Sequence, residues 1–233
     1  MAESIRFGDP AIEVRLRRHA AARRMVLRIP RAGGGPSLTL PLAATLAAAR
    51  AFLREQEPWL RRHMAARPEG VPVGEGTELP IGDARLTVRG HAGRRLFVAD
   101  GVLHVPGRPA GLAPRVGAFV KDAARRGCAS AVERHAARIG RAPRRISLRD
   151  PRSRWGSCTE GGDLMFSWRL ALAPSAVLDY VVAHEVAHLA ELNHSPRFWA
   201  EVRRLCPDFE AHRTWLRRHG PDLHAFDFAA RSA

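Results

Sequence analysis

Two histidines and a glutamate stand in the pattern HExxH at residues 184–188, and His194 follows six residues later. Residues four apart lie on one face of an α-helix, so His184 and His188 could bind a single metal ion. Glu185 lies next to that face, where it could accept a proton from a metal-bound water. A turn could bring His194 back as a third ligand. Three protein ligands leave the fourth position of zinc open, which is the catalytic rather than the structural arrangement.

The residues around this motif predict a buried helix, because nearly all of its other positions between 180 and 189 are apolar. Two histidines and a glutamate in such a helix need partners, since unpaired buried polar groups are costly. A metal ion would supply them. The alternatives are core histidines satisfied by ordinary hydrogen bonds and, for His194, a capping or surface histidine.

The sequence also marks where this helix begins and ends. Residues 174–175, Pro and Ser, are typical of a helix start. Asn193 predicts the end, because Asn tolerates the left-handed conformation of a C-cap. Ser195 and Pro196 predict the N-cap and first position of a new helix. We therefore expect His194 at the junction of two helices, facing the metal.

A β-hairpin is expected just before the helix, because residues 154–159 and 164–168 favour strands and flank a Gly-Gly turn. An edge strand beside a metal cleft could pair with an extended peptide, although plain sheet structure explains the hairpin equally well. Tyr180, His212 and Arg154 are candidates for stabilising an oxyanion, and none of them stands out.

The remaining elements follow from hydrophobic periodicity and turn residues. We expect strands at 12–17, 25–29 and 37–40 with a loop at 31–36, a helix at 43–67 that Pro58 kinks or splits, and a linker at 68–76. We then expect a meander of strands at 84–88, 95–98 and 102–105, with a tight turn at Asp100-Gly101, a helix at 114–139 and a strand at 145–148. No internal repeat is evident.

Composition limits the class of protein. The 233 residues carry a net charge of +15, 45% hydrophobic residues and three widely spaced cysteines, so we expect a cytoplasmic globular protein without disulfides. No segment resembles a signal peptide or membrane span, so no membrane partner is expected. Lys121 is the only lysine, and such arginine dominance is typical of GC-rich genomes. The basic surface leaves nucleic-acid binding open without demonstrating it.

Four segments together resemble the YgjP-like metallopeptidases, which are relatives of the SprT and Wss (WLM) zinc proteases. They are Arg154–Cys158, Leu170–Pro174, Asp179–Leu189 and Asn193–Trp199. The resemblance covers roughly residues 145–220. It implies zinc ligands at His184, His188 and His194, a catalytic Glu185, and an α+β fold in which a minimal zincin-like domain packs a small sheet on the HExxH helix.

The prediction is therefore a zinc-dependent metallopeptidase that hydrolyses peptide bonds of a polypeptide substrate through a zinc-activated water, with Glu185 as general base. We expect three regions: strands and a long helix at 1–70, a β-meander at 71–110, and the metallopeptidase domain at 111–233. Two alternatives stay open. One is a metal-dependent phosphohydrolase acting on nucleotides, which arginine would suit although no phosphate loop is present. The other is a non-catalytic, zinc-braced module that binds nucleic acid or protein.

Overall fold

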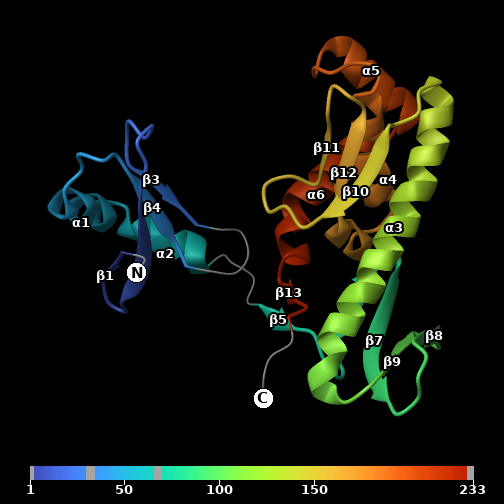
Figure 1. Ribbon diagram of the computed structural model, residues 1–233, viewed down its shortest axis with the longest axis horizontal. Coiled ribbons are helices and arrows are strands. Elements are labelled where there is room, and N and C mark those ends of the chain that lie inside the picture. The colour runs from blue at the N-terminus through green and yellow to red at the C-terminus, as the bar shows by residue number, and fades with distance from the viewer. Residues whose placement is uncertain (1–2, 30–34, 66–69, 230–233) are drawn as a thin grey trace. The chain divides into compact units, whose positions relative to one another are not determined.

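The chain divides into two compact units, Met1–Glu69 and Gly70–Ala233, in the computed structural model (Figure 1). Residues 3–29, 35–65 and 70–229 are described. They form six α-helices and four small β-sheets. The fold is mixed α+β, which confirms the predicted class. None of the described helices combines the length and apolar character that crossing a bilayer requires.

The first unit is a four-stranded sheet with two helices. Its strands, in the order β1-β2-β4-β3, are β1 (Ser4–Phe7), β2 (Ile12–Arg18), β4 (Ser37–Leu40) and β3 (Val26–Arg28). Alternate residues of β2 point inward, so Val14 and Leu16 are buried against Leu38 and Leu40 of the parallel neighbour β4. Strand β1 was missing from the prediction, and most of the expected loop at 31–36 lies outside the described residues.

The helix expected at 43–67 consists of two helices, α1 (Leu46–Glu55) and α2 (Glu57–Ala65). The split confirms the interpretation of Pro58, which occupies the second position of α2, where a proline costs no helical hydrogen bond. Leu53 and Leu60, one from each helix, are fully buried in the core of this unit. Residues 66–67 lie outside the described part, as do residues 68–69 of the expected linker.

The second unit begins with another four-stranded sheet, in the order β6-β7-β9-β8. Its strands are β6 (Glu78–Ile81), β7 (Ala84–His91), β8 (Phe97–Ala99) and β9 (Val102–Pro106). The expected meander is wrong, because β9 pairs parallel with β7, so that of the three expected strands only β8 and β9 form a hairpin. The parallel pairing places Leu103 and Val105 beside Val88 in one buried layer. The tight turn at Asp100-Gly101 is confirmed, with φ values of 49° and 73°.

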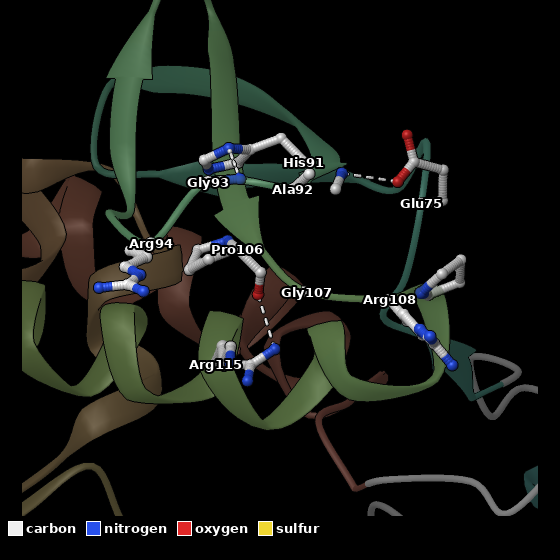
Figure 2. A pocket seen from close by; sticks show the side chains of 11 residues that line it. Glu75, His91, Ala92, Gly93, Arg94, Pro106, Gly107, Arg108 and Arg115 are labelled. Atoms are coloured by element: carbon white, nitrogen blue, oxygen red, sulfur yellow. Dashed lines mark hydrogen bonds between the residues drawn. The ribbon is translucent and has the colours of Figure 1, made fainter.

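One end of this sheet carries an open hollow of about 820 Å³ beside the first turn of the next helix (Figure 2). Two of its polar side chains are held by backbone groups: Arg115 Nη1 donates to Pro106 O at 2.6 Å, and Glu75 Oε2 accepts from Gly90 N at 2.7 Å. The side chains of Arg94, Arg108 and Arg115 spread apart in the view instead of converging. The hollow therefore has no single focus of positive charge.

The rest of this unit is built around helix α3 (Leu112–Ile139), which is 28 residues long. The elements after it are β10 (Arg145–Arg149), β11 (Gly156–Cys158), β12 (Asp163–Ser167), α4 (Ser175–Ala187), α5 (Pro196–Leu205) and α6 (Phe209–Leu223). Strands β10, β12 and β11 form a sheet in that order, and the β11–β12 pair is the expected hairpin. Short strands β5 (Val71–Pro72) and β13 (Phe226–Asp227) pair in parallel. The sheet residues before α3 and the helices after it share one hydrophobic core.

Candidate metal centre

Helix α4 carries His184 and Glu185 of the HExxH motif, and His188 is its C-cap residue. Four of its thirteen residues are valines, which are mediocre helix formers, so packing rather than intrinsic propensity stabilises it. It contacts α3, α5, α6 and strands β11 and β12. Nine of its residues are buried, including Glu185. A polar residue in this helix therefore faces protein on nearly every side, and only a specific partner can satisfy it.

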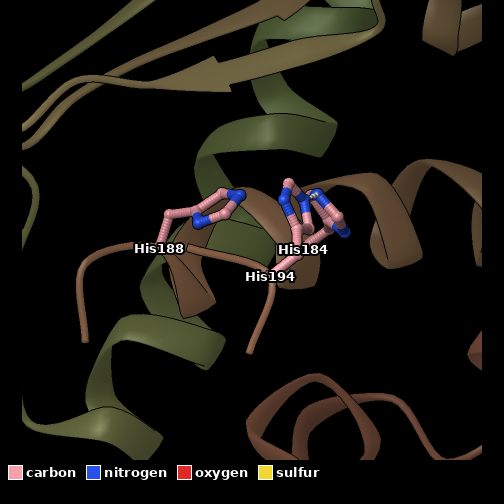
Figure 3. A group of neighbouring side chains, drawn as sticks. All are labelled: His184, His188 and His194. Atoms are coloured by element: carbon pink, nitrogen blue, oxygen red, sulfur yellow. Dashed lines mark hydrogen bonds between the residues drawn. The ribbon is translucent and has the colours of Figure 1, made fainter. Parts of the chain in front are cut away.

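The structure brings the three predicted histidines together (Figure 3). One ligand nitrogen of each of His184, His188 and His194 lies within 4.8 Å of the other two. The closest pair, His184 Nε2 and His194 Nε2, is 3.2 Å apart. Two nitrogens bound to one tetrahedral zinc at about 2.0–2.1 Å are separated by about 3.4 Å. The closest pair therefore matches the spacing of two zinc ligands, and the three nitrogens together are close enough to hold one metal ion.

The return of the chain to this cluster follows from local structure after α4. The helix ends at Ala187, whereas the sequence predicted an end at Asn193, six residues later. It ends early because the backbone N–H groups of Leu189 and Ala190 form tight i→i−3 hydrogen bonds, at 2.9 and 3.0 Å. Asn193 instead closes a short turn, its Oδ1 accepting from Ser195 N at 3.1 Å. His194 lies between the two residues of that turn.

Helix α5 begins as predicted. Ser195 is its N-cap, with Oγ accepting from Phe198 N at 3.3 Å, and Pro196 is the first helical residue. The cap fixes the backbone directly after His194. Phe198 is fully buried and stacks on the His188 ring, with centroids 4.3 Å apart. The start of α5 thus supports two of the three histidines.

The hydrogen bonds and pKa values of the histidines suit metal ligation. His188 Nδ1 lies 3.0 Å from Glu191 O, an interaction in which the ring donates and which leaves Nε2 free. His184 Nδ1 is buried and has no hydrogen-bond partner among the described residues. Burial lowers the pKa of His184 to about 3, with smaller effects from His188, His194 and Arg213. Burial also lowers the pKa of His188. Both rings are therefore neutral near pH 7, as metal ligands must be.

Glu185 is 7% exposed and lies against strand β11. A Cβ atom added to Gly156 would come within 2.5 Å of Glu185 Cγ and 2.6 Å of its Oε1. The missing side chain of Gly156 is thus what makes room for the carboxylate. Burial raises the pKa of Glu185 to about 7, although the positive charge of Arg154 opposes this. The carboxyl group can therefore gain or lose a proton near neutral pH.

The three oxyanion candidates are placed differently. Tyr180 is 6% exposed, and its ring centroid lies 6.1 Å from that of His184. Arg154 is exposed and close enough to affect Glu185 electrostatically. The structure gives His212 no ring contact with any of the three histidines. No hydrogen bond selects one of the three for the role.

Sequence reasoning missed two contributors to the site, Gly156 and Trp199. A glycine inside a strand often marks a close backbone approach, and that signal could have identified Gly156. In the sequence, Trp199 was named only as the end of a segment that resembles the family, yet its ring centroid lies 5.7 Å from those of both His184 and His194. Side chains far apart in sequence thus complete the surroundings of the motif.

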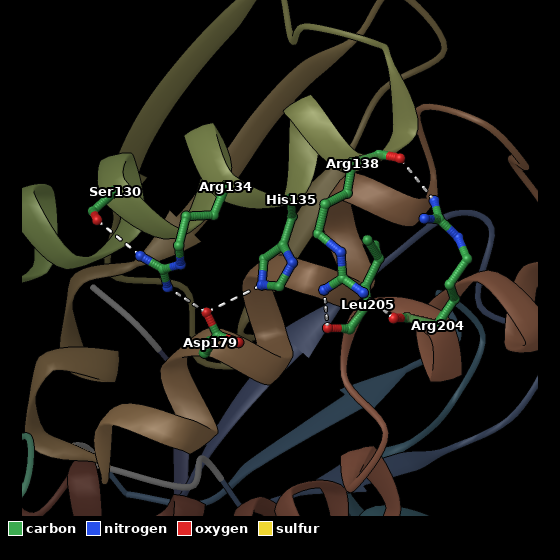
Figure 4. A network of polar contacts seen from close by, with 7 residues as sticks. All are labelled: Ser130, Arg134, His135, Arg138, Asp179, Arg204 and Leu205. Atoms are coloured by element: carbon green, nitrogen blue, oxygen red, sulfur yellow. Dashed lines mark hydrogen bonds and ion pairs between the residues drawn. The ribbon is translucent and has the colours of Figure 1, made fainter.

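A polar network on the side of α3 anchors α4 and α5 (Figure 4). Asp179 of α4 accepts from Arg134 at 2.7 Å and from the buried His135 at 3.1 Å. Arg138 of the same helix α3 donates to Leu205 O, at the end of α5, at 2.7 Å. The two helices that carry the metal-site residues are therefore fixed to one rigid element.

Comparison with known families agrees with this geometry, in which three histidines could hold a metal ion. The family model "YgjP-like, metallopeptidase domain" matches residues 23–219. The chain belongs to this family and is thus a metallopeptidase-type hydrolase, for which the family implies a metal ion.

Other comparisons add little. No curated protein matches the chain. Among solved structures, it is similar to the crystal structure of the metallopeptidase zymogen of Pyrococcus abyssi abylysin, with 20% identity and a TM-score of 0.35. The similarity covers 40% of this chain and 92% of that one. A TM-score of 0.35 describes a partial overlap of elements and not a shared overall fold.

Proposed function

We propose that this protein is a zinc-dependent peptidase in which His184, His188 and His194 hold the metal and Glu185 is the general base. The observation that carries the proposal is the convergence of three imidazoles within 4.8 Å, beside the buried carboxylate of Glu185. Imidazole ligands suit zinc, and a three-ligand site leaves a position open. The contact of strands β11 and β12 with α4 supports the minimal zincin-like domain that the resemblance implies.

When bound, zinc would polarise the scissile carbonyl and make a water molecule acidic enough to ionise near neutral pH. Glu185 accepts the proton of the attacking water and passes it to the leaving amine. Its raised pKa, about 7, supports this role because the same group must take up and release a proton in each cycle. Gly156 leaves room for the carboxylate, and the low exposure of Glu185, 7%, shields the group from bulk water.

The β11 strand is suited to receive the substrate. Among the described residues it pairs only with β12, so its other edge has free backbone donors and acceptors. An extended peptide added to that edge would run past Glu185, since Gly156 of the same strand contacts the carboxylate. Main-chain pairing of this kind would favour an unfolded or flexible segment of a polypeptide as substrate.

The test compares wild type with Glu185→Gln, both loaded with zinc. Wild type should cleave a peptide library. Glu185→Gln should cleave it at least about 10²-fold more slowly, while its zinc binding stays the same as that of wild type. Exposed Glu160→Gln, in the turn of the hairpin, is the matched control and should cleave normally.

The same preparation should be offered nucleoside triphosphates and a single-stranded oligonucleotide. Turnover of the nucleotides without peptide cleavage would replace the proposal by a phosphohydrolase. Binding of the oligonucleotide with unchanged function in Glu185→Gln would replace it by a zinc-braced binding module.

A further inference from the structure

Arg213 lies beside the histidine cluster without an acidic partner. It belongs to α6, and its guanidinium carbon lies 5.1 Å from the centroid of the Trp199 ring. That ring is in turn 5.7 Å from the rings of His184 and His194. Only one aromatic ring separates Arg213 from the candidate ligands. Its charge reaches them, since it contributes, after burial and the neighbouring histidines, to the lowered pKa of His184.

Arg154 approaches the same site from the sheet. Arg154 lies two residues before Gly156, the first residue of β11, whose backbone meets Glu185. Trp155 O, between them, accepts from Ser167 N at 2.8 Å, which extends the pairing with β12 to this segment. The opposing effect of Arg154 on the raised pKa of Glu185 agrees with this placement.

Neither arginine forms an ion pair among the described residues, unlike two arginines near the end of α5. Arg203 and Arg204 of α5 form ion pairs with Glu210 at 3.4 Å and with Glu201 at 2.5 Å. Within the described part of the chain, no carboxylate lies within 4.0 Å of Arg154 or of Arg213. Glu185, whose pKa the charge of Arg154 affects, is buried and serves proton transfer in the proposed reaction.

Building on the proposed function, we infer that the substrate carries a carboxylate close to the scissile bond and that Arg154 and Arg213 bind it. The guanidinium group is planar and matches a carboxylate with two parallel hydrogen bonds. A divalent metal would add two further positive charges and disfavour lysine or arginine in the substrate at these positions. The carboxylate is either an Asp or Glu side chain or the C-terminus of the substrate chain, and the two sources can be separated by experiment.

The test uses ten-residue peptides in matched pairs with zinc-loaded wild type. One set differs by Glu or Gln at each position within three residues of the cleaved bond. The other set has a free or an amidated C-terminus near that bond. We expect the carboxylate member of one set to be cleaved with a kcat/KM about tenfold higher, as for one hydrogen-bonded charge pair. The set that shows this effect identifies the source.

Variants assign the preference to the two arginines. Arg213→Gln and Arg154→Gln should each reduce the ratio of kcat/KM between acidic and amide peptides towards one, and Arg213→Lys should retain part of it. A general loss of activity would lower kcat/KM for both peptides equally, so it cancels in this ratio. Arg217→Gln, which changes an exposed residue one turn further along α6, is the control and should leave both the ratio and the activity unchanged.

A binding measurement keeps the inference separate from the proposed function. Isothermal titration of zinc-loaded Glu185→Gln with the same pairs should show about tenfold tighter binding of the acidic member, lost in the double variant with Arg213→Gln. Equal cleavage within the Glu/Gln pairs and also within the free and amidated pairs would overturn the inference and leave the peptidase standing. If wild type cleaves no peptide, the proposed function fails, and equal binding of both members would then overturn the inference as well.

Discussion

Gly156 of strand β11 lies so close to Glu185 of helix α4 that a Cβ at position 156 would fall 2.5 Å from Glu185 Cγ and 2.8 Å from its Cδ. Contacts this short do not occur between real side chains, so one of the two groups would have to move. Glu185 is 7% exposed and has no open space into which to retreat. A backbone atom of the sheet thus determines the position of the proposed general base.

Gly156→Ala should therefore displace the carboxylate of Glu185. We expect kcat for peptide cleavage to fall about 10²-fold, because a shift near 1 Å in a catalytic group has effects of that size. Zinc content should not change, since Gly156 does not touch the histidines. Gly161→Ala is the control, because its added Cβ would meet only Thr159 Oγ1, at 3.9 Å. Normal activity of Gly156→Ala would refute the positioning role.

The N-cap of α5 should matter for metal affinity as well as for stability. Ser195→Ala removes the hydrogen bond to Phe198 N, and we expect a loss of about 1 kcal/mol in the free energy of unfolding. Because Ser195 directly follows His194, we also expect zinc affinity to fall about tenfold, measured by competition with a chelating dye.

Thr45→Ala is the matched control for that prediction. Thr45 caps α1 in the same way, accepting from Ala48 N at 3.1 Å, but lies in the first unit. Its loss should reduce stability by about the same 1 kcal/mol and leave zinc affinity as in wild type. Equal zinc affinity in both variants would show that the cap has no part in placing His194.

Asp179 should stabilise the fold in a pH-dependent way. Burial alone would raise its pKa, but the hydrogen bonds and charges of His135 and Arg134 outweigh burial and lower the pKa below 3.8. A lowered pKa in the folded state means that the stabilisation is complete above the unfolded pKa and is lost as pH falls through the folded one. Asp179→Asn should therefore cost about 1–3 kcal/mol at pH 7 and progressively less below about pH 4.

Chemical denaturation at pH 7 and pH 3 measures this difference. The control is Asp222→Asn, whose carboxylate is 3.6 Å from His219 and 61% exposed in its side chain. Exposed pairs contribute about 0–1 kcal/mol, so that variant should resemble wild type at both pH values. A constant cost for Asp179→Asn from pH 7 to pH 3 would contradict the assignment.

The cysteines should be unreactive in the folded protein. Burial raises the pKa of Cys128 to about 12 and those of Cys158 and Cys206 to about 11. The thiolate is the reactive form of a cysteine. At pH 8, less than about one part in a hundred of each of the three cysteines is therefore in the thiolate form. A thiol reagent such as dithiobisnitrobenzoate should label the three residues only after unfolding. Rapid labelling of the native protein would contradict the burial of these thiols.

Several features of the site were predictable because they depend on local sequence. The HExxH spacing fixes which side chains share a helix face, and Ser195-Pro196 is a strong helix start. The hairpin before the helix followed from its glycine turn. These signals act over a few residues, and tertiary packing did not override them.

Other features depend on contacts that local patterns do not encode. The approach of Gly156 to Glu185 joins residues 29 positions apart, and the parallel pairing of β7 with β9 depends on the core beneath both strands. The end of α4 at Ala187 was missed because Asn193 forms a turn of its own instead of a helix cap. Packing and side-chain hydrogen bonds decided these outcomes.

Zinc stoichiometry tests the central claim most directly. Wild-type protein, stripped with a chelator, incubated with zinc and desalted, should contain one zinc per chain by plasma mass spectrometry. His194→Ala should lose most of it, while His219→Ala, an exposed histidine on α6, should retain it. Wild-type protein that binds no stoichiometric zinc under these conditions would contradict the metal site and the peptidase built on it.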